Sequence, residues 1–286
     1  MLELGKVKKN IEFNDRFKSV LEVLKSIAVA QFHSLEKKLN IFEPFDRLLQ
    51  DFFDSIDINQ IKHPLLEGGD FGKAVIAITS DQGLLGGLNV RVVASALERV
   101  QPNRDHLIII GEQGKTHARH GKIPFAAFPG VHDFERHKQA LSLRNYLFEK
   151  IRERKFLSIE VVYPHALSLV NQRIECATLL PLPREGNTAS ENEKIDLSEA
   201  ILESSLPHML EYLAYLRVGL KLEDLFGISR VAEMAARFMR LEESTQKIQE
   251  MNRKLKLQYF RLRHAVIDQS MRELFSARAL YAKESF

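Results

Sequence analysis

The sequence predicts a long antiparallel coiled coil of the N- and C-terminal helices, which carries an inserted α/β domain with a mostly parallel sheet. Two observations lead to this fold class. Both ends of the chain have long stretches without Gly or Pro in which apolar residues recur every three or four positions, whereas the middle alternates short apolar runs with helical segments. We therefore expect an N-terminal helical region over 1–62, an α/β domain over 63–195 and a C-terminal helical region over 196–286.

Composition places the chain among soluble globular proteins. It has 286 residues, of which 45% are hydrophobic and 28% charged, and its formal net charge of +3 does not indicate a general polyanion binder. The single cysteine, Cys176, excludes an intramolecular disulfide and fits a reducing compartment. Neither a signal peptide nor a run of roughly 20 apolar residues is visible, so we expect any membrane association to go through partners.

The N-terminal helix is expected from Lys6 to Glu43, a stretch without Gly or Pro. Its apolar residues mostly step by three and four and predict one buried stripe, which comprises Phe13, Phe17, Val20, Leu21, Leu24, Ile27, Ala28, Leu35 and Leu39. Such a stripe needs a partner helix, and the C-terminal helix is the natural one. The two ends of the chain would then pair antiparallel.

The middle of the chain reads as strand and helix in alternation. Strands are expected at 74–79, 106–111, 124–128, 158–163 and 173–180, and helices at 86–100, 112–121 and 134–155. This order predicts a mostly parallel sheet. The polar stretch 184–194 has no periodicity and is expected to be a mobile loop.

The C-terminal region begins with a helix over 198–219, in which Pro207 fits near the start. Gly219 and Gly227 are expected to be weak points of the helical pattern. From Ile228 to Phe286 the chain has no Gly or Pro and could form a rod of roughly 90 Å. Its heptad stripe is formed by Val231, Met234, Phe238, Leu241, Thr245, Ile248, Asn252, Leu255, Tyr259, Leu262 and Val266. Asn252 either fixes the register of this stripe or faces water.

Two other functions can be read from local patterns. The glycine-rich turn at 83–87 follows a strand and precedes a helix, as in phosphate-binding loops, but it matches neither the dinucleotide pattern nor a Walker loop. The predicted C-terminal rod is rich in Lys and Arg, which would suit a coiled-coil scaffold or a nucleic-acid-binding protein. Binding of DNA or RNA would then depend steeply on salt. No catalytic set of the Ser/His/Asp, paired-carboxylate or P-loop kind is visible.

The stretch Ile78–Asn89 (ITSDQGLLGGLN), together with the helical ends, resembles the gamma subunit of F-type ATP synthases over essentially the whole chain. The matching turn residues are Ser80, Asp81, Gly83, Leu84, Gly86, Gly87 and Asn89. The EMAAR run at 233–237 and Gln258-Tyr259 are similar to the C-terminal helix of that family. Its C-terminal signature is altered here, because only Glu273 retains an expected acid, and this departure resembles the alternate, sometimes sodium-linked branch of F-type ATPases.

The resemblance implies a non-catalytic rotor shaft that needs no cofactor or metal of its own. Its expected partners are the alpha and beta subunits of the catalytic head, the epsilon subunit and the c-subunit ring, with no nucleic acid and no direct membrane insertion. The expected location is the cytoplasmic side of a bacterial or archaeal cell membrane, as a peripheral part of the complex. The coupling ion is a proton or sodium.

The resemblance also assigns residues to two contacts with the beta subunit. A catch loop of beta would meet a set on the last turns of the rod, namely Arg263, His264, Asp268, Gln269 and Glu273. Acidic lever loops of beta would meet a basic face formed by Arg253, Lys254, Lys256 and Arg261. The turn residues at 80–89 are expected to have a structural role.

Overall fold

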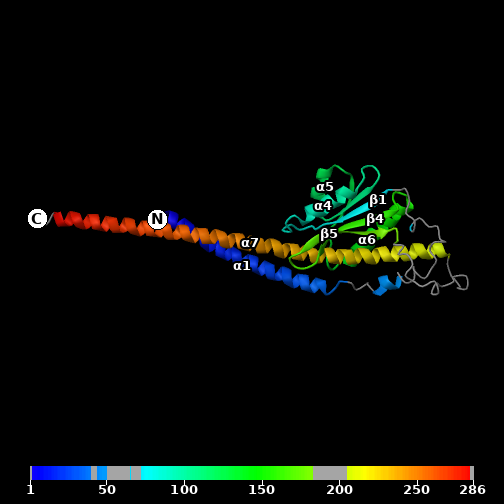
Figure 1. Ribbon diagram of the computed structural model, residues 1–286, viewed down its shortest axis with the longest axis horizontal. Helices are drawn as coiled ribbons and strands as arrows, with labels where there is room; N and C mark the ends of the chain where they lie inside the picture. Colours follow the sequence, from blue (N-terminus) through cyan, green and yellow to red (C-terminus); the bar gives the residue numbers. More distant parts are fainter. Residues whose placement is uncertain (1, 40–43, 50–64, 66–71, 183–204, 284–286) are drawn as a thin grey trace. The chain divides into compact units, whose positions relative to one another are not determined.

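The computed structural model describes residues 2–39, 44–49, 65, 72–182 and 205–283. The chain forms two compact units, one of Met1–Ile27 with Phe238–Phe286 and one of Ala28–Arg237. Two helices, α1 (Leu2–Glu36) and α7 (Leu206–Lys283), each run through both units (Figure 1). The predicted loop at 184–194 and the expected helix start at 198 lie outside the described residues.

The first unit, which we call the shaft, is an antiparallel pair of helices. Asp15 bonds Asn252 and Lys25 bonds Glu242, so residue numbers rise on one helix as they fall on the other. The buried positions of α7 are Leu241, Thr245, Ile248 and Asn252, and they are followed by the half-buried positions Leu255, Tyr259, Leu262 and Val266. This is the predicted heptad stripe of α7, and the coiled coil is confirmed.

The predicted buried stripe of α1 is wrong in the shaft, apart from Leu21. The side chains that face α7 recur at heptad spacing and include three polar residues, the full set being Leu4, Val7, Ile11, Asn14, Lys18, Leu21 and Lys25. Phe13, Phe17, Val20, Leu24 and Ile27 are instead exposed. Two sets of residues have heptad spacing on this helix, and the more apolar set points away from α7.

The second unit contains a five-stranded sheet with the order β3-β2-β1-β4-β5. Its strands are β1 (Lys73–Ile78), β2 (His106–Ile110), β3 (Phe125–Phe128), β4 (Ser158–Ala166) and β5 (Gln172–Leu180). All neighbouring strands are parallel except β4 and β5, which pair antiparallel. The predicted, mostly parallel sheet is therefore confirmed, and its last strand returns as a hairpin.

Helices cover both faces of the sheet (Figure 1). The helices between the strands are α4 (Leu88–Arg99), α5 (Glu112–Ala118), the short 3-10 helix η2 (Arg119–Gly121) and α6 (Arg136–Arg152). Val75 and Ala77 of β1 pack in a cluster with α4, whereas Ala74, Ile76 and Ile78 pack in a cluster with α6 and α7. Alternate residues of a strand point to opposite faces, and the apolar run of β1 is buried on both.

Gly219 and Gly227 do not interrupt α7, which is continuous through both. Instead they allow close packing. A Cβ atom at Gly227 would lie 2.6 Å from Nη1 of Arg136 and 3.1 Å from Cδ2 of Leu39, and one at Gly219 would lie 3.0 Å from Cδ of Arg144. The missing side chains let neighbouring residues of the second unit approach the backbone of α7.

Candidate functional site on the long helices

The turn after β1 is held by its own side chains. Asn89, at the start of α4, donates from Nδ2 to Oγ of Ser80 at 2.9 Å and accepts the Ser80 backbone N–H at 3.2 Å. Both residues are buried. Gly86 has a φ of +60°, which favours glycine, while Gly83 and Gly87 are exposed. The sequence-matched residues thus form one locked turn.

Asp81 ties the ends of three strands together. One oxygen, Oδ1, accepts the backbone N–H of Glu112 after β2 at 2.9 Å and that of Gly130 after β3 at 3.0 Å. A Cβ atom at Gly130 would lie 2.5 Å from Cγ of Asp81, so a larger residue there would displace this carboxylate. The carboxylate therefore joins the turn that follows β1 to the loops that follow β2 and β3.

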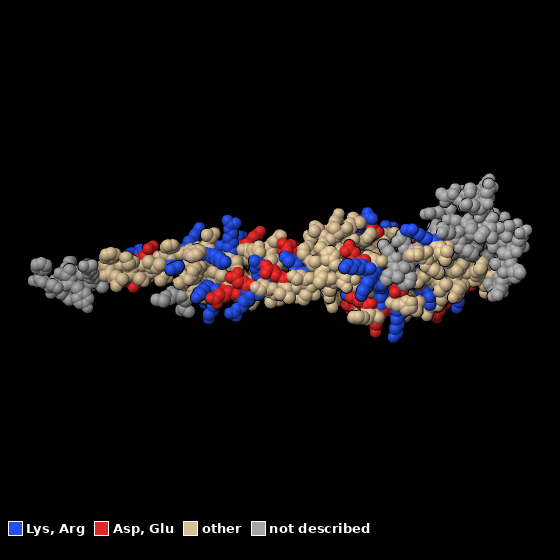
Figure 2. Space-filling view, turned by 90° about the horizontal axis from the view of Figure 1, so that it is seen from below, with Lys and Arg blue, Asp and Glu red and all other residues tan. Residues whose placement is uncertain are grey.

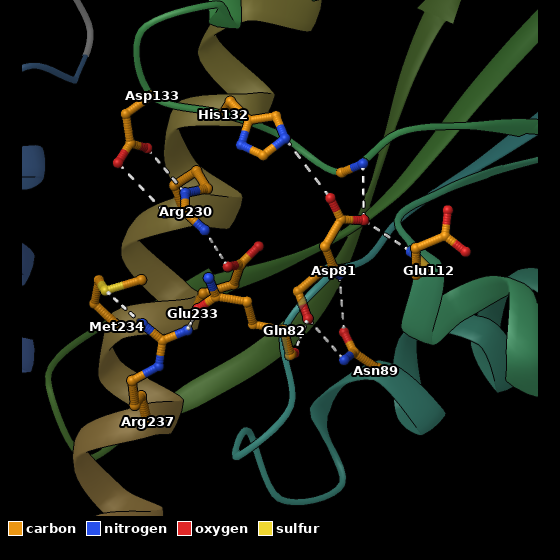
Figure 3. Close-up of polar contacts among 12 residues, drawn as sticks. Asp81, Gln82, Asn89, Glu112, His132, Asp133, Arg230, Glu233, Met234 and Arg237 are labelled. Carbon is orange, nitrogen blue, oxygen red and sulfur yellow. Dashed lines mark hydrogen bonds and ion pairs between the residues drawn. The ribbon is translucent and has the colours of Figure 1, made fainter.

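The residue after Asp81 reaches α7. Gln82 accepts a hydrogen bond at Oε1 from Nη2 of Arg237 at 2.9 Å (Figure 3). Two turns earlier on α7, Arg230 donates from Nε to Oδ1 of Asp133 at 2.9 Å and from Nη1 to Oε2 of Glu233 at 2.5 Å. We call these five residues the junction of α7 with the sheet domain.

Glu233 is the most buried charged group of the junction. Only 2% of it is exposed, and burial raises its pKa to about 7, although Arg230 and Arg237 oppose this shift. A carboxyl group in such surroundings holds its proton far more tightly than an exposed one. Two positive side chains nevertheless lie beside it, so its ionised form is partly compensated (Figure 3).

Apolar contacts reinforce the junction on both sides of α7. Leu85 and Leu88, from the turn and the start of α4, cluster with Ala236. Phe32 of α1 clusters with three buried residues of α7, Val231, Met234 and Ala235. This stretch of α7 is thus enclosed by the turn, by α1 and by the loop that carries Asp133.

Sequence reasoning missed the junction as a site. The EMAAR motif contains Glu233 and Arg237, but their partners are far away in the chain: Gln82 for Arg237, and Asp133 for Arg230. One signal was available, because an ionisable residue in an otherwise apolar run of a helix needs a partner.

The predicted catch residues all lie exposed on α7. Gln269 donates to Glu273 at 3.0 Å, one turn away on the same helix, and Arg263, His264 and Asp268 are also exposed. Since Asp15 pairs with Asn252 and α1 begins at Leu2, the residues from about 267 onward extend past the start of α1 (Figure 1). The basic-face residues are exposed as well, namely Arg253, Lys254, Lys256 and Arg261.

None of the helices in the described part of the chain has an apolar stretch that could cross a lipid bilayer.

Comparison with known proteins gives a consistent result. A family model described as ATP synthase matches residues 3–280. The chain belongs to the ATP synthase gamma family. It is similar to the ATP synthase gamma chain of Clostridium novyi (strain NT), with 25% identity and 94% of each chain covered. The gamma chain of Trichormus variabilis is 24% identical, with 96% of this chain and 98% of that chain covered.

Solved structures share the fold of this gamma-family chain. A chain of the Euglena gracilis mitochondrial ATP synthase, in an assembly described as OSCP/F1/c-ring, has a TM-score of 0.68 at 16% identity and covers 99% of this chain and 96% of its own length. A chain of the Tetrahymena thermophila central stalk and c-ring has a TM-score of 0.59 at 14% identity, covering 79% of this chain and 99% of its own.

Family membership settles the class of function. As a gamma subunit the chain is a non-catalytic part of the central rotor of an F-type ATP synthase. The alternative, a coiled-coil scaffold or nucleic-acid-binding protein that uses the basic helix, is not favoured.

Proposed function

We propose that this chain transmits torque between an ion-driven membrane ring and the catalytic head of an F-type ATP synthase. Its partners are the alpha and beta subunits, the epsilon subunit and the c-subunit ring, and the ion is a proton or sodium. The complex lies on the cytoplasmic face of a bacterial or archaeal membrane. Residues 1–62 and 196–286 supply the helical shaft and its continuations, and 63–195 supply the globular domain.

The observation that carries this proposal is the continuity of α7. This helix runs from Leu206 to Lys283 without a break, so it packs on the sheet domain in one unit and pairs with α1 in the other. A continuous helix transmits rotation because its backbone hydrogen bonds resist local unwinding. Rotation of an asymmetric shaft changes the relative stability of the states of each catalytic site, which links nucleotide affinity to angle.

In this proposal, the exposed residues near the end of α7 hold the shaft at preferred angles. Arg263 and His264, with Asp268, Gln269 and Glu273, bind the catch loop of beta. The basic face, Arg253, Lys254, Lys256 and Arg261, attracts the acidic lever loops over a longer range and need not fix one geometry.

The test is Arg263→Ala in the assembled complex. We expect a lower ATPase turnover, because a charged contact that defines an angular stop is lost. A matched control is Arg91→Ala, which removes an exposed arginine from α4 of the sheet domain. Turnover equal to that of the unsubstituted complex would remove the catch assignment for Arg263.

A further inference from the structure

One side of α1 in the shaft carries a row of large apolar residues that the described residues leave largely exposed. Five large apolar residues of α1 share it, and they are between 41% and 67% exposed: Phe13, Phe17, Val20, Leu24 and Ile27. Their steps of four, three, four and three residues follow the same heptad spacing as the seam with α7. Phe13 and Phe17 also stack, with ring centroids 6.2 Å apart.

The two sides of the helix pair differ in chemistry. The polar contacts between the helices, Asp15 with Asn252 and Lys25 with Glu242, lie on one side. A mixed groove on that side is lined by charged residues, among them Lys18 and Lys256, and by the apolar Leu257 and Phe260. Heptad geometry puts Phe17 and Leu24 on the opposite side of the seam. The antiparallel register brings Met251 of α7, which is 49% exposed, level with Phe17 on this side. We call the five residues of α1 with Met251 the apolar groove.

Basic residues border the apolar groove. On α7, one basic residue recurs every seven positions at its margin, in the series Arg240, Lys247, Lys254 and Arg261. Arg240 and Lys247 share Glu243, whereas Lys254 and Arg261 are exposed and take part in no ion pair among the described residues. Arg16, also exposed, lies at the margin on α1. Figure 2 shows basic and acidic side chains interspersed along the helical part of the molecule.

From this pattern we infer that the apolar groove binds a third helix, supplied by a neighbouring subunit, that is apolar every three or four residues and acidic on its flanks. A helix running along α1 contacts all five apolar residues, because their spacing follows the supercoil, whereas a flat surface would touch only some of them. Acidic flanks match the basic margins. The inference rests on the proposed function, since it needs a neighbouring subunit around the shaft.

Binding of a third helix also explains why the stripe of α1 that faces α7 is more polar than the exposed stripe. Asn14, Lys18 and Lys25 face α7, while the aromatic and aliphatic residues face outward. A lone helix pair would be more stable with the two stripes exchanged, because more apolar area would be buried. The observed arrangement reserves that area for a partner.

The first experiment is photocrosslinking in the native complex. A benzophenone amino acid replaces Val20 in the groove or, as the control, Ser19, which is exposed on another side of α1. We expect the Val20 variant to label a peptide with apolar residues at three- and four-residue spacing and acidic flanks, and the Ser19 variant not to label it. A Val20 product from a second copy of this chain or from a segment without that pattern would overturn the inference, as would no Val20 product at all.

The second experiment measures how firmly the chain is held. Two double variants are compared, all at exposed positions of α1. The first combines Phe17→Ser and Leu24→Ser, and the control combines Ser19→Ala and Ser26→Ala. We expect the first pair to lower the fraction of chain that co-purifies with the catalytic head at least tenfold, and the second pair to leave it unchanged. Circular dichroism of the free chains checks that both remain helical. Equal co-purification of the two variants would overturn the inference.

The two proposals fail in different ways. If the unsubstituted chain does not co-purify with alpha and beta subunits, the proposed function is wrong. If it does co-purify and the Val20 label lacks the expected pattern, only the third-helix inference is wrong.

Discussion

Two stretches of the same helix differ sharply in their surroundings. All six residues of α7 from Val231 to Ala236 are buried, whereas most residues from Arg253 to Ser276 are exposed. Both stretches are helical and both contain apolar and charged residues. One stretch is therefore fixed by contacts within its own chain, whereas the other leaves most of its side chains exposed. The origin of the difference is the alanine-rich sequence at 232–236, which lets neighbouring elements approach the helix closely.

The largest expected effect comes from placing a charge in the fixed stretch. Ala235 is fully buried, so Ala235→Asp should lower the free energy of unfolding by about 3 kcal/mol or more, because the carboxylate would have no partner there. The matched control is Ala265→Asp in the exposed stretch of the same helix, which should change stability by less than about 0.5 kcal/mol. Denaturant unfolding of both variants measures the difference. Equal effects would mean that the two stretches are not distinct in solution.

A smaller effect is expected from the titration of Glu233 in the fixed stretch. Its pKa is raised from the ordinary 4.5 to about 7 by burial, against the opposing effect of Arg230 and Arg237. The folded state therefore keeps a proton that the unfolded state releases above pH 4.5. The stabilisation is complete below that pH and is lost as the pH rises through about 7, a loss on the order of 3 kcal/mol.

Glu233→Gln removes this titration. Between pH 5 and pH 8 the free energy of unfolding of the unsubstituted chain should fall more steeply than that of the variant, as measured by urea unfolding. Glu243→Gln, on the exposed side of α7, is the control. The pKa of Glu243 is lowered by its hydrogen bonds to Lys247 and Arg240, so its titration lies below this window. Parallel pH curves for the unsubstituted chain and Glu233→Gln would contradict the expectation.

The smallest effect is expected for an ion pair in the shaft. Nζ of Lys25 lies 2.7 Å from Oε2 of Glu242, and its hydrogen bond lowers the pKa of that carboxyl group, so this stabilisation is present above the ordinary pKa and lost as the pH falls. Both side chains are partly exposed, so Glu242→Gln should cost less than about 1 kcal/mol, and high salt should reduce the loss. Thermal unfolding at low and high salt is the measurement. A loss of several kcal/mol, independent of salt, would show that the pair behaves as a buried one.

The strands and the heptad stripe of α7 could be predicted because their signals are local. The run His106–Ile110 contains four consecutive apolar residues, three of them β-branched, and it forms β2 as expected. The partner face of α1 could not be predicted, because two stripes with the same spacing compete and the more apolar one faces outward. Asn252 shows the same limit. Its heptad position was visible, but only the structure reveals its burial and its 2.7 Å bond to Asp15.

Some parts of the candidate site could likewise be predicted from the sequence, and others could not. The turn residues 80–89 were identified from a family pattern, and the structure brings Ser80 and Asn89 into direct contact. The junction was missed because Arg230 and Asp133 are 97 residues apart in the chain, and no spacing rule connects them. The proposed catch and basic-face residues are exposed, and their contacts remain predictions that depend on other chains.

The single carboxylate of Asp81 has a mechanical consequence. It accepts amides that follow β2 and β3 while its own backbone follows β1, and the adjacent Gln82 holds Arg237 of α7. A twisting load that enters through α7 is therefore shared among three strands instead of pulling on one loop. The sheet and α7 are thereby mechanically coupled through the neighbouring residues Asp81 and Gln82.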